Sequence, residues 1–223
     1  MSELIVMLTH NDVTVKDAKA QFVSCSDLPV VFWGFKNIGL PLHEMQDLVE
    51  TMKAAGKTTF LEVVTLEEPD CLEGARMANS CGFDYLLGTV YYPSVAAYVK
   101  EHHIKYLPFC GTVTGHPSIL SGSIDEIVSD GLYLQSMGVQ GTDLLAYRHK
   151  DAPEDLIRAI CAALSMPVIV AGSIDSFERI DIVERINPWA YTIGSAMFNH
   201  KFSDDPSFRG QLEAILDHLN GKK

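Results

Sequence analysis

The feature that most constrains this chain is an alternation of short apolar runs with longer amphipathic stretches, which recurs eight times. Each run is apolar at nearly every position and bounded by Gly, Pro or Asp, which is typical of a strand buried on both faces of a parallel sheet. The predicted strands are Leu4–Leu8, Val30–Phe35, Thr59–Val64, Tyr85–Leu87, Tyr106–Phe109, Gly141–Ala146, Val168–Val170 and Tyr191–Ile193.

The stretches between these runs have the periodicity of amphipathic helices. Gly56, Gly82 and Gly138 follow three of them, where a left-handed residue often ends a helix. The predicted helices are Leu42–Ala55, Cys71–Cys81, Ser94–His102, Ile124–Met137, Pro153–Leu164, Ser176–Ile186 and Ser207–Leu219.

Strict alternation of strands and helices leaves two architectures, a closed eightfold barrel and an open doubly wound sheet. Eight units in 223 residues favour the barrel. An open sheet would carry a glycine-rich phosphate loop at its first turn, whereas Thr9-His10-Asn11-Asp12 contains no glycine. No linker or low-complexity run divides the chain. The sequence therefore predicts a single (β/α)8 TIM barrel, one α/β domain over residues 1–223.

Charge and cysteine content limit the partners and the compartment. The net charge of −12 argues against binding to nucleic acid or to an anionic membrane. No apolar run approaches the roughly 18 residues of a membrane span, and the N-terminus lacks the basic region of a signal peptide. The five cysteines form no CxxC pair, so reduced thiols are expected. We therefore expect a cytoplasmic protein.

The last two strand–loop units, Val168–Ile174 and Tyr191–Met197, predict a phosphate site. Each places a glycine after the strand, then a serine and then a helical turn, so that backbone N–H groups can approach an anion. Barrels of this type often hold a phosphate after strands seven and eight. The alternative is that both glycines only let a strand turn into its helix.

The segments Ala171-Gly172-Ser173-Ile174 and Ile193-Gly194-Ser195-Ala196-Met197-Phe198 resemble the closing signature of the ribulose-phosphate-binding barrel superfamily. That superfamily includes keto-gulonate-phosphate and orotidine-phosphate decarboxylases, pentulose-phosphate epimerases and thiamin-phosphate synthase. The resemblance implies that Gly172, Ser173, Gly194 and Ser195 contact a phosphate group.

A weaker similarity, over Gly82–Gly111, is to the keto-deoxy-phosphogluconate aldolases, which use a lysine on strand six as a Schiff-base nucleophile. The body of strand six here, Thr142–Ala146, contains no lysine. Strand three, Phe60–Thr65, lacks the Asp-x-Lys-x-x-Asp pattern of the decarboxylases, and strand two lacks the His-x-Met-Asp pattern of the epimerases. The sequence thus indicates a superfamily without indicating the reaction of any one member.

Polar residues at strand ends are the catalytic candidates: Lys36, Glu62, His10 and Arg148. Glu62 lies within an apolar strand, so its carboxylate must be paired, bound to a metal or raised in pKa. It is either an ion-pair partner of Lys36 or an acid–base group or Mg²⁺ ligand. Lys36 itself fits a Schiff-base amine, a cation that polarises a carbonyl, or a side chain extending to solvent.

Arg148 fits a carboxylate-binding or second anion-binding residue, or an outward salt bridge to Asp151 or Glu154. The loop from Gly111 to Ser123 has the length and glycine content of a lid. Possible lid or substrate contacts are Thr112, Thr114, His116 and His149. The histidines are either proton shuttles or simply solvated, and they form no zinc-binding motif.

These residues predict an enzyme that acts on a small phosphorylated sugar or keto-acid, as an aldolase or other lyase or as an isomerase, next to a carbonyl. Two alternatives remain. One is a non-catalytic phosphate-ester sensor resembling the glycerol-3-phosphate-responsive antiterminators. The other is a transferase resembling thiamin-phosphate synthase, which would need Mg²⁺. We expect no other cofactor, and a homodimer is plausible.

Overall fold

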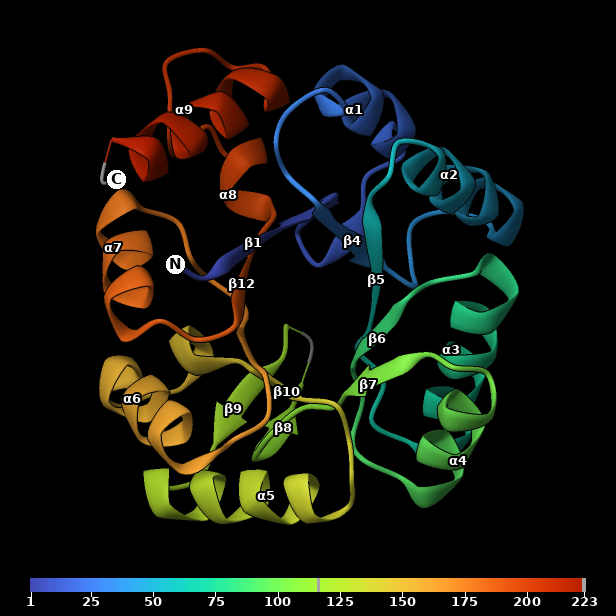
Figure 1. Cartoon of the computed structure of the whole chain (residues 1–223), viewed down its shortest axis with the longest axis vertical. Coiled ribbons are helices and arrows are strands. Elements are labelled where there is room, and N and C mark those ends of the chain that lie inside the picture. The colour runs from blue at the N-terminus through green and yellow to red at the C-terminus, as the bar shows by residue number, and fades with distance from the viewer. Residues whose placement is uncertain (116, 222–223) are drawn as a thin grey trace.

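Eight parallel strands form the centre of the molecule, in the order β10-β11-β12-β1-β4-β5-β6-β7 (Figure 1). Phe109 and Asp143 form a parallel bridge, and the Asp143 N–H donates to the carbonyl of Pro108 at 2.9 Å, so β10 also adjoins the end of β7. The computed structural model, which describes residues 1–115 and 117–221, therefore has the predicted (β/α)8 fold. The strands are β1 (Glu3–Met7), β4 (Phe32–Lys36), β5 (Thr58–Val63), β6 (Tyr85–Gly88), β7 (Lys105–Leu107), β10 (Thr142–Leu144), β11 (Val168–Val170) and β12 (Ala190–Ile193).

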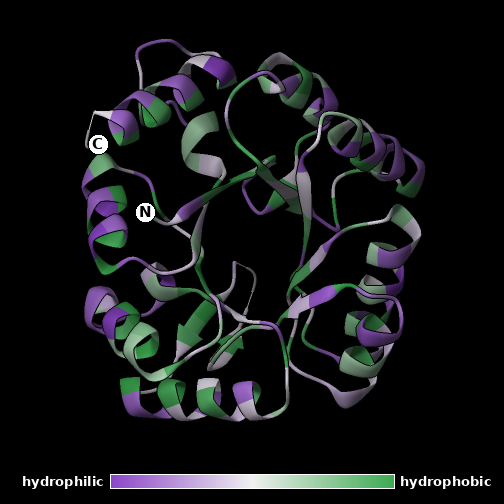
Figure 2. Ribbon diagram, viewed as in Figure 1, coloured by the Kyte–Doolittle hydropathy of each residue, from purple (hydrophilic) through white to green (hydrophobic). Residues whose placement is uncertain are grey.

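Helices surround the strands, and Figure 2 shows their mixed hydrophobic and hydrophilic surfaces around largely hydrophobic strands. Gly56, Gly82 and Gly138 have φ of +72°, +79° and +78°, which confirms the left-handed positions predicted there. Among the described residues, no helix combines the length and the apolar character that crossing a bilayer requires. The helices are α1 (Ala18–Cys25), α2 (Leu42–Ala54), α3 (Glu68–Cys81), α4 (Pro93–Glu101), α5 (Ile124–Ser136), α6 (Pro153–Ala163), α7 (Phe177–Ile186), α8 (Ser195–Phe198) and α9 (Phe208–Asn220), with a 3-10 turn, η1 (Ala146–Arg148).

The barrel interior is apolar over most of its height and charged at one end. Side chains alternate between the two faces of each strand, so Phe32, Gly34 and Lys36 of β4 share the inward face. Phe60 and Glu62 of β5 face inward in the same way. Hydrophobic side chains fill the lower layers, and the charged side chains lie at the C-terminal ends of the strands, where barrel enzymes hold their sites.

Two antiparallel hairpins interrupt the regular alternation at that end. The first consists of β2 (Thr9–His10) and β3 (Val13–Thr14), and the second of β8 (Thr112–Thr114) and β9 (Ile119–Ser121). The sequence predicts a turn after the first strand and a loop from Gly111 to Ser123, and it indicates neither hairpin. The second hairpin lies within the predicted lid, and it shows that the described part of this loop is ordered by ladder pairing.

Candidate functional site

Lys36 and Glu62 meet at the top of the barrel because their strands pair in register. Lys36 of β4 lies directly beside Glu62 of β5, and Lys36 Nζ is 3.3 Å from Glu62 Oε1. Both are buried, with 3% and 9% of their surfaces exposed. The Lys36–Glu62 ion pair, one of the alternatives that the sequence left open for Glu62, is present, and the two side chains also line the cavity described below.

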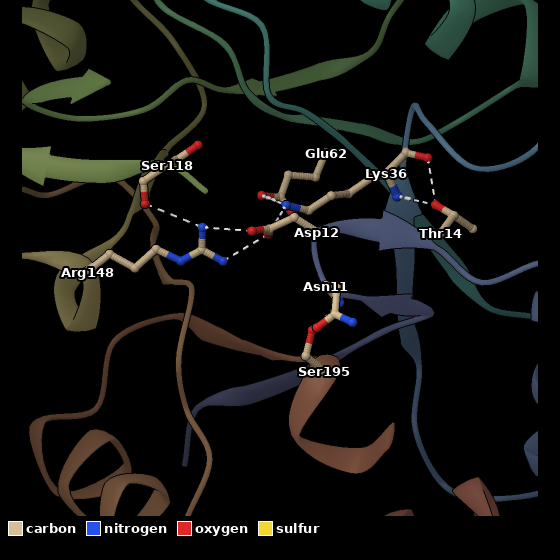
Figure 3. A network of polar contacts seen from close by, with 8 residues as sticks. All are labelled: Asn11, Asp12, Thr14, Lys36, Glu62, Ser118, Arg148 and Ser195. Carbon is tan, nitrogen blue, oxygen red and sulfur yellow. Dashed lines mark hydrogen bonds and ion pairs between the residues drawn. The ribbon is translucent and has the colours of Figure 1, made fainter. Parts of the chain in front are cut away.

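A third charged group, Asp12, was missed by the sequence reading. It stands in the two-residue turn between β2 and β3, where Asn11 and Asp12 both have positive φ, of 50° and 61°, as in a type I′ hairpin turn. This turn directs the Asp12 carboxylate to Lys36 Nζ, at 2.6 Å (Figure 3). A carboxylate in a polar loop gives no signal in sequence, because solvated charges are ordinary there.

Two anchors hold this hairpin over the mouth of the barrel. The Thr14 hydroxyl accepts the Lys36 N–H at 2.9 Å and donates to the Lys36 carbonyl at 2.8 Å. The Asn11 N–H donates to Ser195 Oγ at 3.1 Å, on the opposite side (Figure 3). Ser195 is thus a contact of the hairpin as well as a predicted phosphate contact.

Arg148 binds Asp12 from the far side of the turn. Its Nη2 lies 2.9 Å from Asp12 Oδ1 and its Nη1 lies 3.4 Å from Oδ2 (Figure 3). Both of these nitrogens therefore donate hydrogen bonds to the carboxylate. The alternative of an outward salt bridge to Asp151 or Glu154 is wrong, because η1 turns the Arg148 side chain toward the barrel mouth.

The charges of this cluster fix the protonation states of its members. Burial would raise the pKa of Asp12, but the hydrogen bond from Arg148 and the charge of Lys36 outweigh it and lower this pKa to about 2. Burial would lower the pKa of Lys36, but the Glu62 and Asp12 carboxylates outweigh it and raise this pKa above its ordinary value. Lys36 is therefore an ammonium ion at neutral pH.

The loop after β11 offers free backbone donors. The N–H groups of Gly172, Ser173 and Ile174 make no hydrogen bond within residues 1–115 and 117–221. Gly172 has φ of +78°, and a Cβ there would lie 2.8 Å from Arg148 Nε, so glycine is required both by the backbone and by the arginine that packs on it. Gly172 is therefore needed for the local structure, and this need is compatible with the predicted phosphate contact.

The loop after β12 has the same character. Ser195 and Ala196 are the first residues of α8, whose N–H groups have no partner within the helix. A Cβ on Gly194 would lie 2.6 Å from Thr9 Oγ1, so this glycine also allows the hairpin strand to approach closely.

Lys201 is a second residue that the sequence reading missed. The turn after α8 is a Schellman motif: His200 has φ of +53°, its N–H donates to Met197, and the Lys201 N–H donates to the Ala196 carbonyl at 3.1 Å. The chain reverses there, and Lys201 lines the same cavity as Ala196. Its ammonium group has no hydrogen bond or ion pair with any described residue.

One cavity of about 230 Å³ joins these parts of the site. It is smaller than the roughly 300–1,000 Å³ of pockets for drug-sized ligands, which suits a small metabolite. Its polar and loop lining comprises Thr9, Asp12, Lys36, Glu62, Arg148, Gly172, Ser173, Ile174, Asp175, Thr192, Gly194, Ser195, Ala196, Asn199 and Lys201.

The other sequence candidates lie away from this cavity. His10 pairs with Asn199 Oδ1 at 3.0 Å and stacks on Phe198. His149 contacts the carbonyls of Gly122 and Asp151, at 2.7 and 2.6 Å.

In the β8–β9 hairpin, the side chains of Thr112 and Thr114 are exposed. His116 lies outside the described residues. Within the described part of the chain, no three His, Cys, Asp or Glu side chains are grouped so as to hold a metal ion.

No protein-family model matches the sequence, and no curated protein matches it significantly. Solved structures do resemble the fold. Orotidine 5′-phosphate decarboxylase from Pyrococcus horikoshii OT3 aligns with a TM-score of 0.72 and 16% identity, over 98% of this chain and 99% of that chain. The N-acetylmannosamine-6-phosphate 2-epimerase from Clostridium perfringens aligns with a TM-score of 0.65 and 9% identity, over 99% and 93%.

A regulatory protein has the same fold. The glycerol uptake operon antiterminator regulatory protein from Listeria monocytogenes aligns with a TM-score of 0.58 and 16% identity, over 86% of this chain and 91% of that chain. The (β/α)8 fold implied by the sequence resemblance is thus confirmed. Because this fold serves enzymes and a regulator alike, function has to be argued from the site.

Proposed function

We propose that this protein is an enzyme that acts on a small phosphorylated sugar or keto-acid, at a carbon next to a carbonyl group. The observation that carries this proposal is that one and the same cavity is lined by the Lys36–Glu62 pair and by the two glycine loops. A substrate with a phosphate at one end could place its carbonyl beside Lys36 while the loops hold the phosphate. The phosphate esters acted on by the decarboxylase and the epimerase of this fold agree with it.

In this proposal the phosphate is held mainly by backbone donors. Gly172, Ser173 and Ile174, whose N–H groups make no hydrogen bond with described residues, line the cavity together with Ser195 and Ala196. Lys201 adds a positive charge that no described carboxylate neutralises. Such a combination of free N–H groups and one cation is suited to a phosphate dianion.

Lys36 is assigned the role of electrophile. A Schiff-base nucleophile must lose its proton, and the carboxylates around Lys36 favour the ammonium form instead. A buried ammonium ion stabilises negative charge on a carbonyl oxygen in the transition state, where water is excluded. Because Lys36 prefers the ammonium form, it is poorly suited to form a Schiff base of the aldolase type.

Glu62 is assigned the role of base, because its carboxylate lies beside Lys36 in the cavity. In an isomerase, Glu62 would remove the proton from the hydroxyl-bearing carbon next to the carbonyl and return it to the former carbonyl carbon, while the hydroxyl proton moves to the carbonyl oxygen. In a lyase, it would take the proton of a hydroxyl group while the carbon–carbon bond breaks. The electron pair of that bond then moves to the carbonyl oxygen beside Lys36.

Exchange of substrate protons with solvent tests this proposal. A panel of sugar phosphates and phosphorylated keto-acids is first screened by thermal shift, and ligands that stabilise the protein are incubated with it in D₂O. NMR should show loss of the proton next to the carbonyl. Glu62→Gln should slow this exchange by about 10²–10⁴-fold, the usual contribution of a general base. Glu3→Gln, at the opposite end of the barrel, is the matched control.

Two results would count against the proposal. If no phosphate ester stabilises the fold at millimolar concentration, the phosphate site is wrong. If esters bind and no carbon-bound proton exchanges and no product forms, the sensor alternative is favoured, to which the antiterminator of this fold gives specific support.

A further inference from the structure

Asp143 is a buried carboxylic acid that the proposed mechanism does not use. It lies on β10 in register with Ile169 of β11, and Ile169 belongs to the hydrophobic cluster inside the barrel. The side chain of Asp143 therefore faces the interior, and only 1% of the residue is exposed. Its backbone N–H and carbonyl are both used at the seam with Pro108 and Cys110.

By geometry, neither carboxyl oxygen of Asp143 makes a hydrogen bond within the described residues. Burial and the charge of Glu62 oppose the ionised form more strongly than the Gly88 N–H favours it. The charged groups that face it are Glu62 from β5, Lys36 from β4 and Arg148 from η1. Lys36 Nζ is already occupied, at 2.6 Å by Asp12 and at 3.3 Å by Glu62. Arg148 likewise uses its guanidinium on Asp12.

The charges of the cluster balance without Asp143. Two carboxylates, Asp12 and Glu62, face two cations, Lys36 and Arg148. A third ionised carboxylate would be a buried charge without a partner, which is strongly unfavourable. A neutral carboxylic acid at the same place avoids that charge.

We propose that Asp143 carries a proton at neutral pH and acts as a positioning residue, a neutral neighbour that lets Glu62 remain the ionised base beside Lys36. Burial and the charge of Glu62 raise the pKa of Asp143 well above its ordinary value, which agrees with this state.

The protonation of Asp143 also limits the pH range of the site. When Asp143 ionises at high pH, a second negative charge appears near Glu62, which disturbs the Lys36–Glu62 pair and makes the site less favourable for a phosphate dianion. The part of the inference that concerns catalysis rests on the proposed function. The protonation state itself does not, and it can be measured without any substrate.

Stability measurements test the protonation state. The unfolded Asp143 ionises near pH 4, whereas the folded one keeps its proton, so the wild-type protein loses stability as pH rises above about 4. Asp143→Asn cannot ionise. Its folding equilibrium constant relative to wild type should therefore increase between pH 5 and pH 8, by up to about tenfold per pH unit. Urea denaturation at each pH gives this ratio.

Asp143→Leu, which also removes the acid, should show the same dependence on pH. Asp205→Asn is the matched control, since the hydrogen bonds from Ser207 lower the pKa of Asp205 and it stays ionised in this range. A ratio that is flat or falls with pH would overturn the proposal. If neither variant folds, ¹³C-carboxyl aspartate labelling of the wild type should show one protonated carboxyl at pH 7, and its absence is equally decisive.

The pH profile of proton exchange distinguishes a positioning role from a purely structural role, which would leave the profile unchanged. In wild type, proton exchange by Glu62 should decline on the alkaline side of its pH profile, and in Asp143→Asn this decline should disappear. If the pH profile of Asp143→Asn is the same as that of wild type, the positioning role is contradicted. A wild-type protein without exchange activity would instead contradict the proposed function and leave the stability test of Asp143 intact.

Discussion

Asp12 is the carboxylate on which the two cations at the mouth of the barrel converge. Its pKa is lowered to about 2, so its ionised form stabilises the fold above the unfolded pKa of 3.8, and this stabilisation is lost as pH falls toward 2. We expect Asp12→Asn to reduce the free energy of unfolding by about 2 kcal/mol at pH 7. The difference should shrink between pH 4 and pH 2, as measured by denaturant titration. A difference that grows on acidification would contradict the Asp12 interactions.

Four ionisable residues near the proposed chemistry differ in how visible they are in sequence. Lys36 and Glu62 could be predicted because each ends or interrupts an apolar strand. Asp12 could not, since its role depends on a turn that brings it to partners 24 and 136 residues away. Asp143 was not predicted, although a buried aspartate within the apolar strand Gly141–Ala146 is as informative as a buried glutamate.

At the scale of elements, the loop after β11 is shaped by the arginine that packs on it. Gly172→Ala should destabilise the protein through the left-handed φ, by about 1–2 kcal/mol, and further through contact with Arg148. Gly138→Ala is a matched control, because Gly138 has the same φ of +78° and no atom within 4 Å of the added Cβ. We expect the melting temperature of Gly172→Ala to be lower by at least about 2 °C more than that of the control. Equal losses would exclude the Arg148 contact.

Elements with a long hydrophobic signature were predicted well, and short ones were not. All eight barrel strands were located, because each is buried on both faces. The β2–β3 hairpin was missed, since its strands have two residues each and its turn is Asn-Asp rather than the familiar Asn-Gly. Helix α1 was missed as well, because only Ala18, Phe22 and Cys25 of its eight residues are buried.

At the scale of the whole molecule, the net charge distinguishes the proposed enzyme from the alternative of an RNA-binding regulator. With a net charge of −12, the protein should not bind RNA electrostatically. Fluorescence anisotropy with a structured RNA should show no binding at micromolar protein and moderate salt. Salt-dependent binding in that range, strengthened by a phosphate ester, would favour the regulator.

The contact between Asn11 and Ser195 has a consequence for how the site is assembled. The two residues are 184 positions apart, and β1 pairs with β12 next to them. The hairpin that carries Asp12 is therefore fixed on one side by a segment that is synthesised long after it. During synthesis, the first strands can pair with each other well before the cavity exists. The ligand site forms only after β12 and α8 have been made and β12 has paired with β1.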